Sequence, residues 1–221
     1  VLLEEHVLAT IEDGASLMLL AGLADQGAHP ARALMRDGAL AKKITQAQSF
    51  ELDEMMERLH ALEDARIAAS HEGARDAVSE ALRVFKRRES LALYAMEVSG
   101  DRSVRETSRG IAHLAICVTR AALEKAAEFH KRPDLFQEIC VLGMGKLGGL
   151  ELNYSSDIDL ILLCSDACFE DPQARDLLEQ ITREAVSLLE ETTQHGYVFR
   201  VDLRLRPEGS RGLLVPSLSA M

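Results

Sequence analysis

Residues 143–149 read Gly-Met-Gly-Lys-Leu-Gly-Gly, and residues 155–159 read Ser-Ser-Asp-Ile-Asp. Glycines allow a backbone to come close to a phosphate, because no side chain stands in the way. Asp157 and Asp159 are two positions apart, so in an extended chain both carboxylates point to the same face. Two like charges held side by side repel each other, and a bound cation relieves that repulsion. The stretch therefore predicts nucleotide chemistry with carboxylate-bound Mg²⁺.

Apolar runs on both sides of this stretch predict a small sheet with helices. Residues 139–142 form a short apolar strand that ends in the glycines, and residues 158–164 form a second strand that is buried on both faces. Asp171-Pro172 begins a helix that is expected to run to His195-Gly196. Residues 197–205 are expected to be a third strand. One face of this strand would carry Val198, Arg200, Asp202, Arg204 and Arg206.

The first half of the chain has apolar residues at helical spacing. The pattern predicts helices between residues 3 and 42, over residues 52–62, around residues 78–96, and from the capping box Ser103–Glu106 onward. We therefore expect an α+β protein, with a helical region over residues 1–133 and a catalytic domain over residues 134–221. Because the sequence starts at Val1 and stops directly after a motif-like segment, we also expect it to be a piece of a longer chain.

Composition limits the classes of function. The formal net charge of −11 argues against a general nucleic-acid binder, which needs a cationic surface. The sequence contains no apolar run of membrane-spanning length, and 28% of the residues are charged. Four cysteines lie in or beside apolar runs without disulfide or zinc spacing, and are expected to be buried free thiols in a reducing cytoplasm. They are Cys117, Cys140, Cys164 and Cys168.

Two other nucleotide motifs fit the glycines less well. Gly143-x-Gly145-x-x-Gly148 matches the dinucleotide fingerprint, and Asp166 follows at the distance of a ribose-binding acid. That interpretation needs a full crossover helix between the strands, for which residues 147–156 are too short and too rich in turn formers. A P-loop is excluded, because no Gly-Lys-Ser/Thr follows the glycines.

A purely structural interpretation is the remaining alternative. Asp157 and Asp159 could be solvated carboxylates at the start of a strand, and Asp202 could form salt bridges with the neighbouring arginines. The combination of a glycine pair, Asp-x-Asp and a third mid-strand aspartate favours a metal site over this alternative.

The same combination is typical of polymerase-beta-type nucleotidyltransferases, and the resemblance extends to one family. Residues 143–161 and residues 201–209, Val-Asp-Leu-Arg-Leu-Arg-Pro-Glu-Gly, resemble glutamate-ammonia-ligase adenylyltransferases. Residues 82–90 resemble the helical segment that precedes the catalytic domain of that family. The matching motifs extend over about residues 82–216. The resemblance implies an enzyme that adds AMP to a tyrosine of glutamine synthetase or removes it.

The resemblance also implies roles for particular residues. Asp157, Asp159 and Asp202 would hold two Mg²⁺ ions, and Asp202 would orient or deprotonate the attacking group. The backbone N–H groups of Gly148 and Gly149, with Ser156, would contact phosphate oxygens. Candidates for contacts with phosphate or with the protein substrate are Lys146, Arg204 and Arg206, for each of which a structural salt bridge is the alternative.

The direction of the reaction is suggested only by the wording of residues 153–157, Asn-Tyr-Ser-Ser-Asp. This wording resembles the N-terminal half of the family enzyme, which removes AMP by phosphorolysis and releases ADP. ATP-dependent adenylylation and a catalytically silent regulatory fragment are the alternatives. The implied partners are glutamine synthetase, ATP or ADP, phosphate and a PII-type signalling protein, with neither a nucleic acid nor a membrane.

Overall fold

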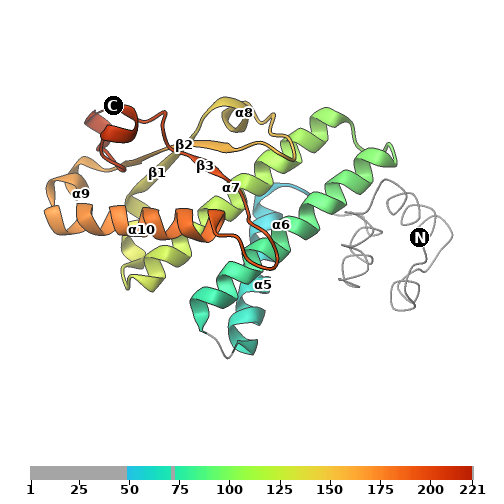
Figure 1. The fold of residues 1–221 in the computed structure, drawn as a ribbon, viewed down its shortest axis with the longest axis horizontal. Helices are drawn as coiled ribbons and strands as arrows, with labels where there is room; N and C mark the ends of the chain where they lie inside the picture. Colours follow the sequence, from blue (N-terminus) through green and yellow to red (C-terminus); the bar gives the residue numbers. More distant parts are fainter. Residues whose placement is uncertain (1–48, 71–72, 221) are drawn as a thin grey trace.

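The computed structural model describes residues 49–70 and 73–220. The helices expected between residues 3 and 42 lie outside these residues. The described part is mostly helical and carries one small sheet, shown in Figure 1. The α+β class expected from the sequence is therefore confirmed.

Three helices precede the sheet, where the apolar spacing predicts them. They are α5 (Leu52–Ala69), α6 (Ala74–Val98) and α7 (Val104–Phe129). The predicted capping box begins α7: the Ser103 hydroxyl accepts from the N–H of Glu106, and the Glu106 carboxylate accepts from the N–H of Ser103. The apolar faces of these helices form a core in which Leu59, Leu82 and Leu114 are fully buried.

The sheet contains three strands in the order β1-β2-β3. A 3₁₀ helix, η1 (Pro133–Glu138), leads from α7 into β1 (Ile139–Gly143), which pairs antiparallel with β2 (Ile158–Cys164). The short helix α8 (Gly145–Gly148) lies between them, and β3 (Val201–Asp202) pairs parallel with β2. An antiparallel β1-β2 pair excludes the dinucleotide interpretation, which requires parallel strands joined by a crossover helix.

Helix α10 (Pro172–Glu190) ends earlier than the sequence pattern predicts. It follows the short helix α9 (Asp166–Glu170), and Asp171 caps it by accepting from the N–H of Gln173. The expected end at His195-Gly196 was wrong. The guanidinium of Arg83, from α6, donates to the carbonyls of Leu188, Glu191 and Gly196, so polar partners are present for a helix that stops at Glu190.

The third strand is also shorter than predicted, covering Val201–Asp202 instead of residues 197–205. Val198 and Phe199 are both buried, and both donate their N–H groups to the carbonyl of Leu189 instead of to a neighbouring strand. At the other end, Asp202 Oδ1 accepts from the N–H of Arg204 at 2.8 Å, which turns the chain. The five residues expected on one strand face therefore do not form one row.

One hydrophobic cluster connects the helices with the sheet. It includes Leu82 of α6, Ala115 of α7, Leu162 of β2 and Leu188 of α10. The predicted domain boundary at residues 133–134 coincides with the start of η1, but the two predicted domains share this cluster. Two 3₁₀ helices follow β3 among the described residues, η2 (Gly209–Arg211) and η3 (Leu218–Ala220).

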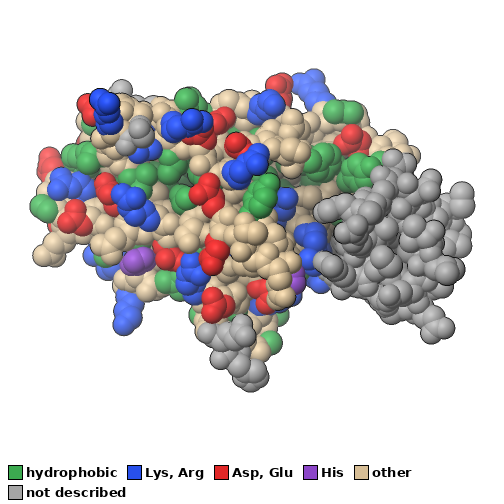
Figure 2. Space-filling model, in the orientation of Figure 1, with side chains coloured by type: hydrophobic (Ala, Val, Ile, Leu, Met, Phe, Trp, Pro, Cys, Tyr) green, Lys and Arg blue, Asp and Glu red, His purple; other side chains and the backbone are tan. Residues whose placement is uncertain are grey.

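The four cysteines are free, and three of them are buried as expected. Cys140 is exposed, contrary to the prediction, because it lies on the outer side of the edge strand β1, paired with Leu163. No helix among the described residues has the length and apolarity that a membrane crossing requires. On the face drawn in Figure 2, Lys and Arg side chains are interspersed with Asp and Glu.

Candidate active site

The glycine turn is shaped around the carboxylate of Asp159. The N–H of Met144 donates to the backbone carbonyl of Asp159 at 2.8 Å. Gly145 has φ +53°, and a Cβ atom at this position would stand 2.8 Å from Oδ2 of Asp159. A Cβ on Gly148 would collide with the carbonyl oxygen of Gly143. Gly145 is therefore favoured by its positive φ and by the nearby Asp159 carboxylate, and Gly148 by the close approach of the Gly143 backbone.

The aspartates lie on the side of the sheet that faces away from the helical core. Side chains alternate along β2, and Ile158, Leu160 and Leu162 belong to the main hydrophobic cluster. Asp159 points to the opposite side, and Asp157 precedes the strand at the same spacing. Asp159 is the register partner of Asp202 on the parallel strand β3. The structure thus places Asp159 and Asp202 side by side, and Asp157 precedes Asp159 by two residues.

Two arginines pair with two of these carboxylates. Arg200 Nε donates to Oδ1 of Asp157 at 2.5 Å. Arg204 Nε lies 3.0 Å from both carboxylate oxygens of Asp202, and its backbone N–H also donates to that side chain. These hydrogen bonds from Arg204 lower the pKa of Asp202 to about 2. Asp202 is therefore an anion throughout the neutral range.

The chemistry of this donor set fits Mg²⁺. All three side chains offer carboxylate oxygens, which Mg²⁺ prefers, and the missing Cβ at Gly145 leaves space at the Asp159 carboxylate. Within residues 49–70 and 73–220, however, no three acidic, His or Cys side chains converge as a ready group of metal ligands. The side chains of Asp157 and Asp202 are turned toward arginines instead.

The other residues predicted to contact phosphate lie in the glycine turn or next to the aspartates. Lys146 is exposed on α8, and the Ser156 hydroxyl donates to Oδ1 of Asn153 at 2.8 Å, beside the aspartates. Gly148 and Gly149 are also at the turn, but their N–H groups already donate to the carbonyls of Met144 and Gly145. Their expected use as phosphate donors is therefore not available in this conformation.

Arg206 belongs to the loop after β3 instead of to the carboxylate cluster. Its Nη1 donates to the carbonyl of Leu203 at 2.6 Å, and its Nε donates to the carbonyl of Gly212 at 3.5 Å. Neither partner is acidic, so the salt-bridge alternative for Arg206 does not describe these contacts. Arg206 therefore links the two ends of this loop, Leu203 and Gly212.

Two residues at the site were not among the sequence candidates. Gly145 was part of the glycine motif, but its contact with Asp159 depends on a positive φ that the sequence does not display. Arg200 was expected on the strand face, yet its pairing with Asp157 depends on how β3 is placed beside β2. Its spacing of two from Asp202 was the available signal.

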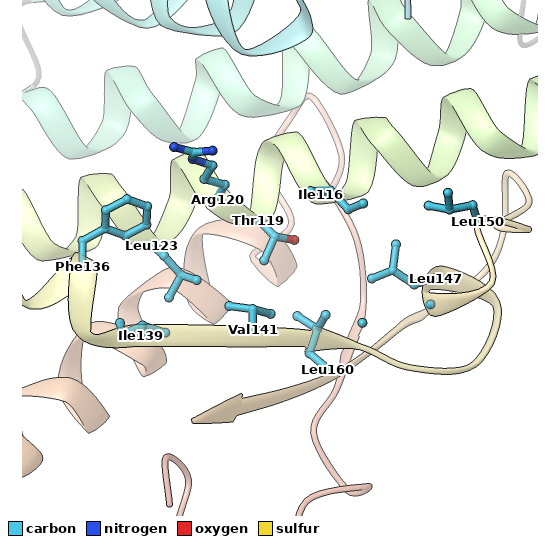
Figure 3. Close-up of a pocket in the computed structure, with 12 residues that line it drawn as sticks. Ile116, Thr119, Arg120, Leu123, Phe136, Ile139, Val141, Leu147, Leu150 and Leu160 are labelled. Atoms are coloured by element: carbon cyan, nitrogen blue, oxygen red, sulfur yellow. The ribbon is translucent and has the colours of Figure 1, made fainter. Parts of the chain in front are cut away.

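A cavity of about 470 Å³ lies behind the glycine turn, on the opposite side of the sheet from the carboxylates. Figure 3 shows Thr119 and Leu123 of α7 pointing toward the strand β1, while the Arg120 guanidinium points away from the strand. Leu160, next to Asp159 in the chain, lines this cavity. Because neighbouring residues of a strand point to opposite faces, the cavity is separate from the acidic site.

The geometry agrees with the result of comparing the chain with known families. The model of the glutamate-ammonia ligase adenylyltransferase family, GlnE, matches residues 18–221. The chain belongs to this family. The resemblance inferred from the glycine and aspartate motifs is thereby confirmed, and these motifs are placed within a glutamate-ammonia ligase adenylyltransferase sequence.

Individual relatives carry the same description. A bifunctional glutamine synthetase adenylyltransferase/adenylyl-removing enzyme of Chromobacterium violaceum is 38% identical over 153 residues, which cover 69% of this chain and 17% of that protein. The corresponding enzyme of Thioalkalivibrio sulfidiphilus is 34% identical over 196 residues, which cover 82% of this chain and 19% of that protein. The chain thus spans less than a fifth of these relatives' length.

Proposed function

We propose that this chain carries a Mg²⁺-dependent site that removes AMP from adenylylated glutamine synthetase by phosphorolysis. The observation that carries the proposal is the register pairing of Asp159 with Asp202 beside the glycine turn, in a glutamate-ammonia ligase adenylyltransferase chain. The relatives described above are named for both adenylyl transfer and adenylyl removal. Their names support the reaction class and leave its direction open.

Each residue of the site would have its own role in the reaction. Asp157, Asp159 and Asp202 would hold Mg²⁺, which neutralises charge on phosphate oxygens when it is bound. Lys146 and the Ser156 hydroxyl would hold the adenylyl phosphate. Asp202, an anion at neutral pH, would accept a hydrogen bond from the attacking phosphate and orient it.

In the proposed reaction an oxygen of inorganic phosphate attacks the phosphorus of the adenylyl group. A new P–O bond forms and gives ADP, while the bond between that phosphorus and the tyrosine oxygen breaks. The proton of the attacking hydrogen phosphate ends on the tyrosine oxygen. No oxidant or further reactant is needed, so the products are ADP and unmodified glutamine synthetase.

The direction of the proposal rests on the wording of residues 153–157, which resembles the N-terminal half of the family enzyme. The test is to incubate this chain and Mg²⁺ with adenylylated glutamine synthetase, with and without phosphate, and to measure ADP. Phosphate-dependent ADP release that is absent in Asp159→Asn supports removal. Transfer of labelled AMP from ATP, without such release, would reverse the direction.

Failure of both reactions, together with no binding of Mg²⁺ and ADP by calorimetry, would identify a catalytically silent fragment. We also propose a PII-type signalling protein as a regulator, on the resemblance alone. Its effect is measurable as a change in the rate of ADP release when such a protein is added to the same assay.

A further inference from the structure

Arg200 and Arg204 hold the carboxylates on which the proposed function depends. Arg200 is paired with Asp157, and Arg204 contacts both oxygens of Asp202. Within the described residues, the Asp159 carboxylate has no hydrogen bond or ion pair of its own. Two of the side chains that would bind a cation are thus hydrogen-bonded to an arginine, whereas Asp159 interacts with Arg204 only at longer range.

The Arg200 pair is exposed on both sides, whereas in the Arg204 pair only the guanidinium is. The Arg200 side chain is 59% exposed and that of Asp157 is 50% exposed, while the Arg204 side chain is 80% exposed and that of Asp202 is 20% exposed. Solvent screens such pairs, and holding two long side chains in one geometry costs entropy. Arg200 can consequently leave Asp157 at small cost, whereas Arg204 gives up a stronger interaction with Asp202 and needs another anion in exchange.

A divalent cation and the two guanidinium groups compete for the same oxygens. Asp157 and Asp202 cannot each give their oxygens fully to a cation while they accept hydrogen bonds from Arg200 and Arg204. Once released, each guanidinium remains at the edge of a site that receives phosphate groups. Its planar fork of N–H donors matches phosphate oxygens as well as it matches a carboxylate.

We propose that Arg200 and Arg204 exchange partners during binding, leaving Asp157 and Asp202 when a divalent cation arrives and moving to phosphate oxygens of the substrate. The proposal rests on the proposed function, because it requires a cation and a phosphate at this site. It makes Arg200 a phosphate-binding residue that the sequence motif did not single out, and it gives Arg204 a second role.

The exchange predicts effects of opposite sign in one variant. In Arg200→Gln or Arg204→Gln, Mn²⁺ alone should bind about two- to fivefold more tightly, because a competing cation is gone. The same variants should bind ADP or inorganic phosphate, at saturating Mg²⁺, about tenfold more weakly. Arg183→Gln removes a comparably exposed pair with Glu179 on α10 and should change neither affinity.

Calorimetry with Mn²⁺, ADP and phosphate as separate probes tests the exchange. Weaker binding of ADP alone assigns the arginine to the adenylyl product, and weaker binding of phosphate alone assigns it to the attacking group; either result supports the proposal. Unchanged or weaker Mn²⁺ binding in both arginine variants overturns it. If Asp159→Asn binds Mn²⁺ as wild type does, the metal site of the proposed function is wrong.

Discussion

The carboxylate of Asp159 occupies the space in which a side chain at residue 145 would begin. A Cβ atom on Gly145 would stand 2.8 Å from Oδ2 of Asp159, at a backbone φ of +53°. A side chain at residue 145 would therefore displace the Asp159 carboxylate. This contact lets the role of the turn be tested separately from its backbone strain.

Gly145→Ala should lower the free energy of unfolding by about 1–2 kcal/mol through its positive φ. It should also push the Asp159 carboxylate aside and weaken Mn²⁺ binding about tenfold or more. Urea unfolding and calorimetry measure the two effects. Gly100→Ala is the matched control, because φ is +82° there and no atom lies within 4 Å of the added Cβ. Equal Mn²⁺ affinity in the two variants would contradict the role of the contact.

Asp159→Asn should abolish phosphate-dependent ADP release while leaving the melting temperature unchanged or slightly raised. The carboxylate has neighbouring negative charges at Asp157 and Asp202, so neutralising it removes repulsion from the folded state. Mn²⁺ affinity should fall at least about tenfold, because one charged ligand is lost. A large drop in the melting temperature would instead favour a structural role for this residue.

Glu63→Gln should stabilise the protein at neutral pH. Glu63 is fully buried on α5, and within the described residues its carboxylate oxygens have no hydrogen-bond partner. Burial is the largest cause that raises its pKa, to about 7, with smaller contributions from Glu124, Glu128 and Asp64, while Lys125 lowers it.

Because the pKa of Glu63 is raised on folding, the folded state binds the proton more tightly than the unfolded chain does. Stability should therefore fall as the pH rises from about 4.5 to about 7 and then level off. Glu63→Gln removes this slope, and should gain about 2–3 kcal/mol at pH 8 relative to pH 5 in urea unfolding. An unchanged slope would show that Glu63 is solvated.

Arg83→Met should destabilise the protein by about 3 kcal/mol or more, because it leaves the carbonyls of Leu188, Glu191 and Gly196 without this donor. Arg75→Gln, on the same helix, is the control. Arg75 forms more exposed ion pairs with Glu184 and Glu191, whose loss should cost about 0–1 kcal/mol. If both variants lose the same free energy of unfolding in urea, the buried hydrogen bonds of Arg83 contribute no more than the exposed ion pairs of Arg75.

The sequence predicted the parts of the fold that depend on local patterns. β2 and the capping box of α7 were predicted correctly, because apolar runs and capping side chains act within a few residues. The end of α10 and the length of β3 were not. The end of α10 depends on Arg83, which lies more than 100 residues earlier in the chain, and the length of β3 depends on the turn made by the Asp202 side chain.

The candidate site likewise combines features that the sequence predicted with features that depend on tertiary contacts. The Asp-x-Asp spacing and the third aspartate were visible in the sequence, and the sheet register brings Asp159 and Asp202 side by side. The hydrogen-bond partners of the nearby arginines could not be predicted from the sequence, because they depend on which groups the tertiary structure places next to each guanidinium. Arg200 reaches Asp157, whereas Arg206 reaches backbone carbonyls of its own loop.

Asp159 and Asp202 are held in place by different contacts, and the buried guanidinium of Arg83 belongs to the support of Asp202. Asp159 lies in a strand with neighbours on both sides, whereas Asp202 ends a two-residue strand whose preceding turn is held by α6 through Arg83. Loss of the Arg83 side chain would therefore remove a contact on the chain that leads to Asp202, and would leave the strand neighbours of Asp159 in place.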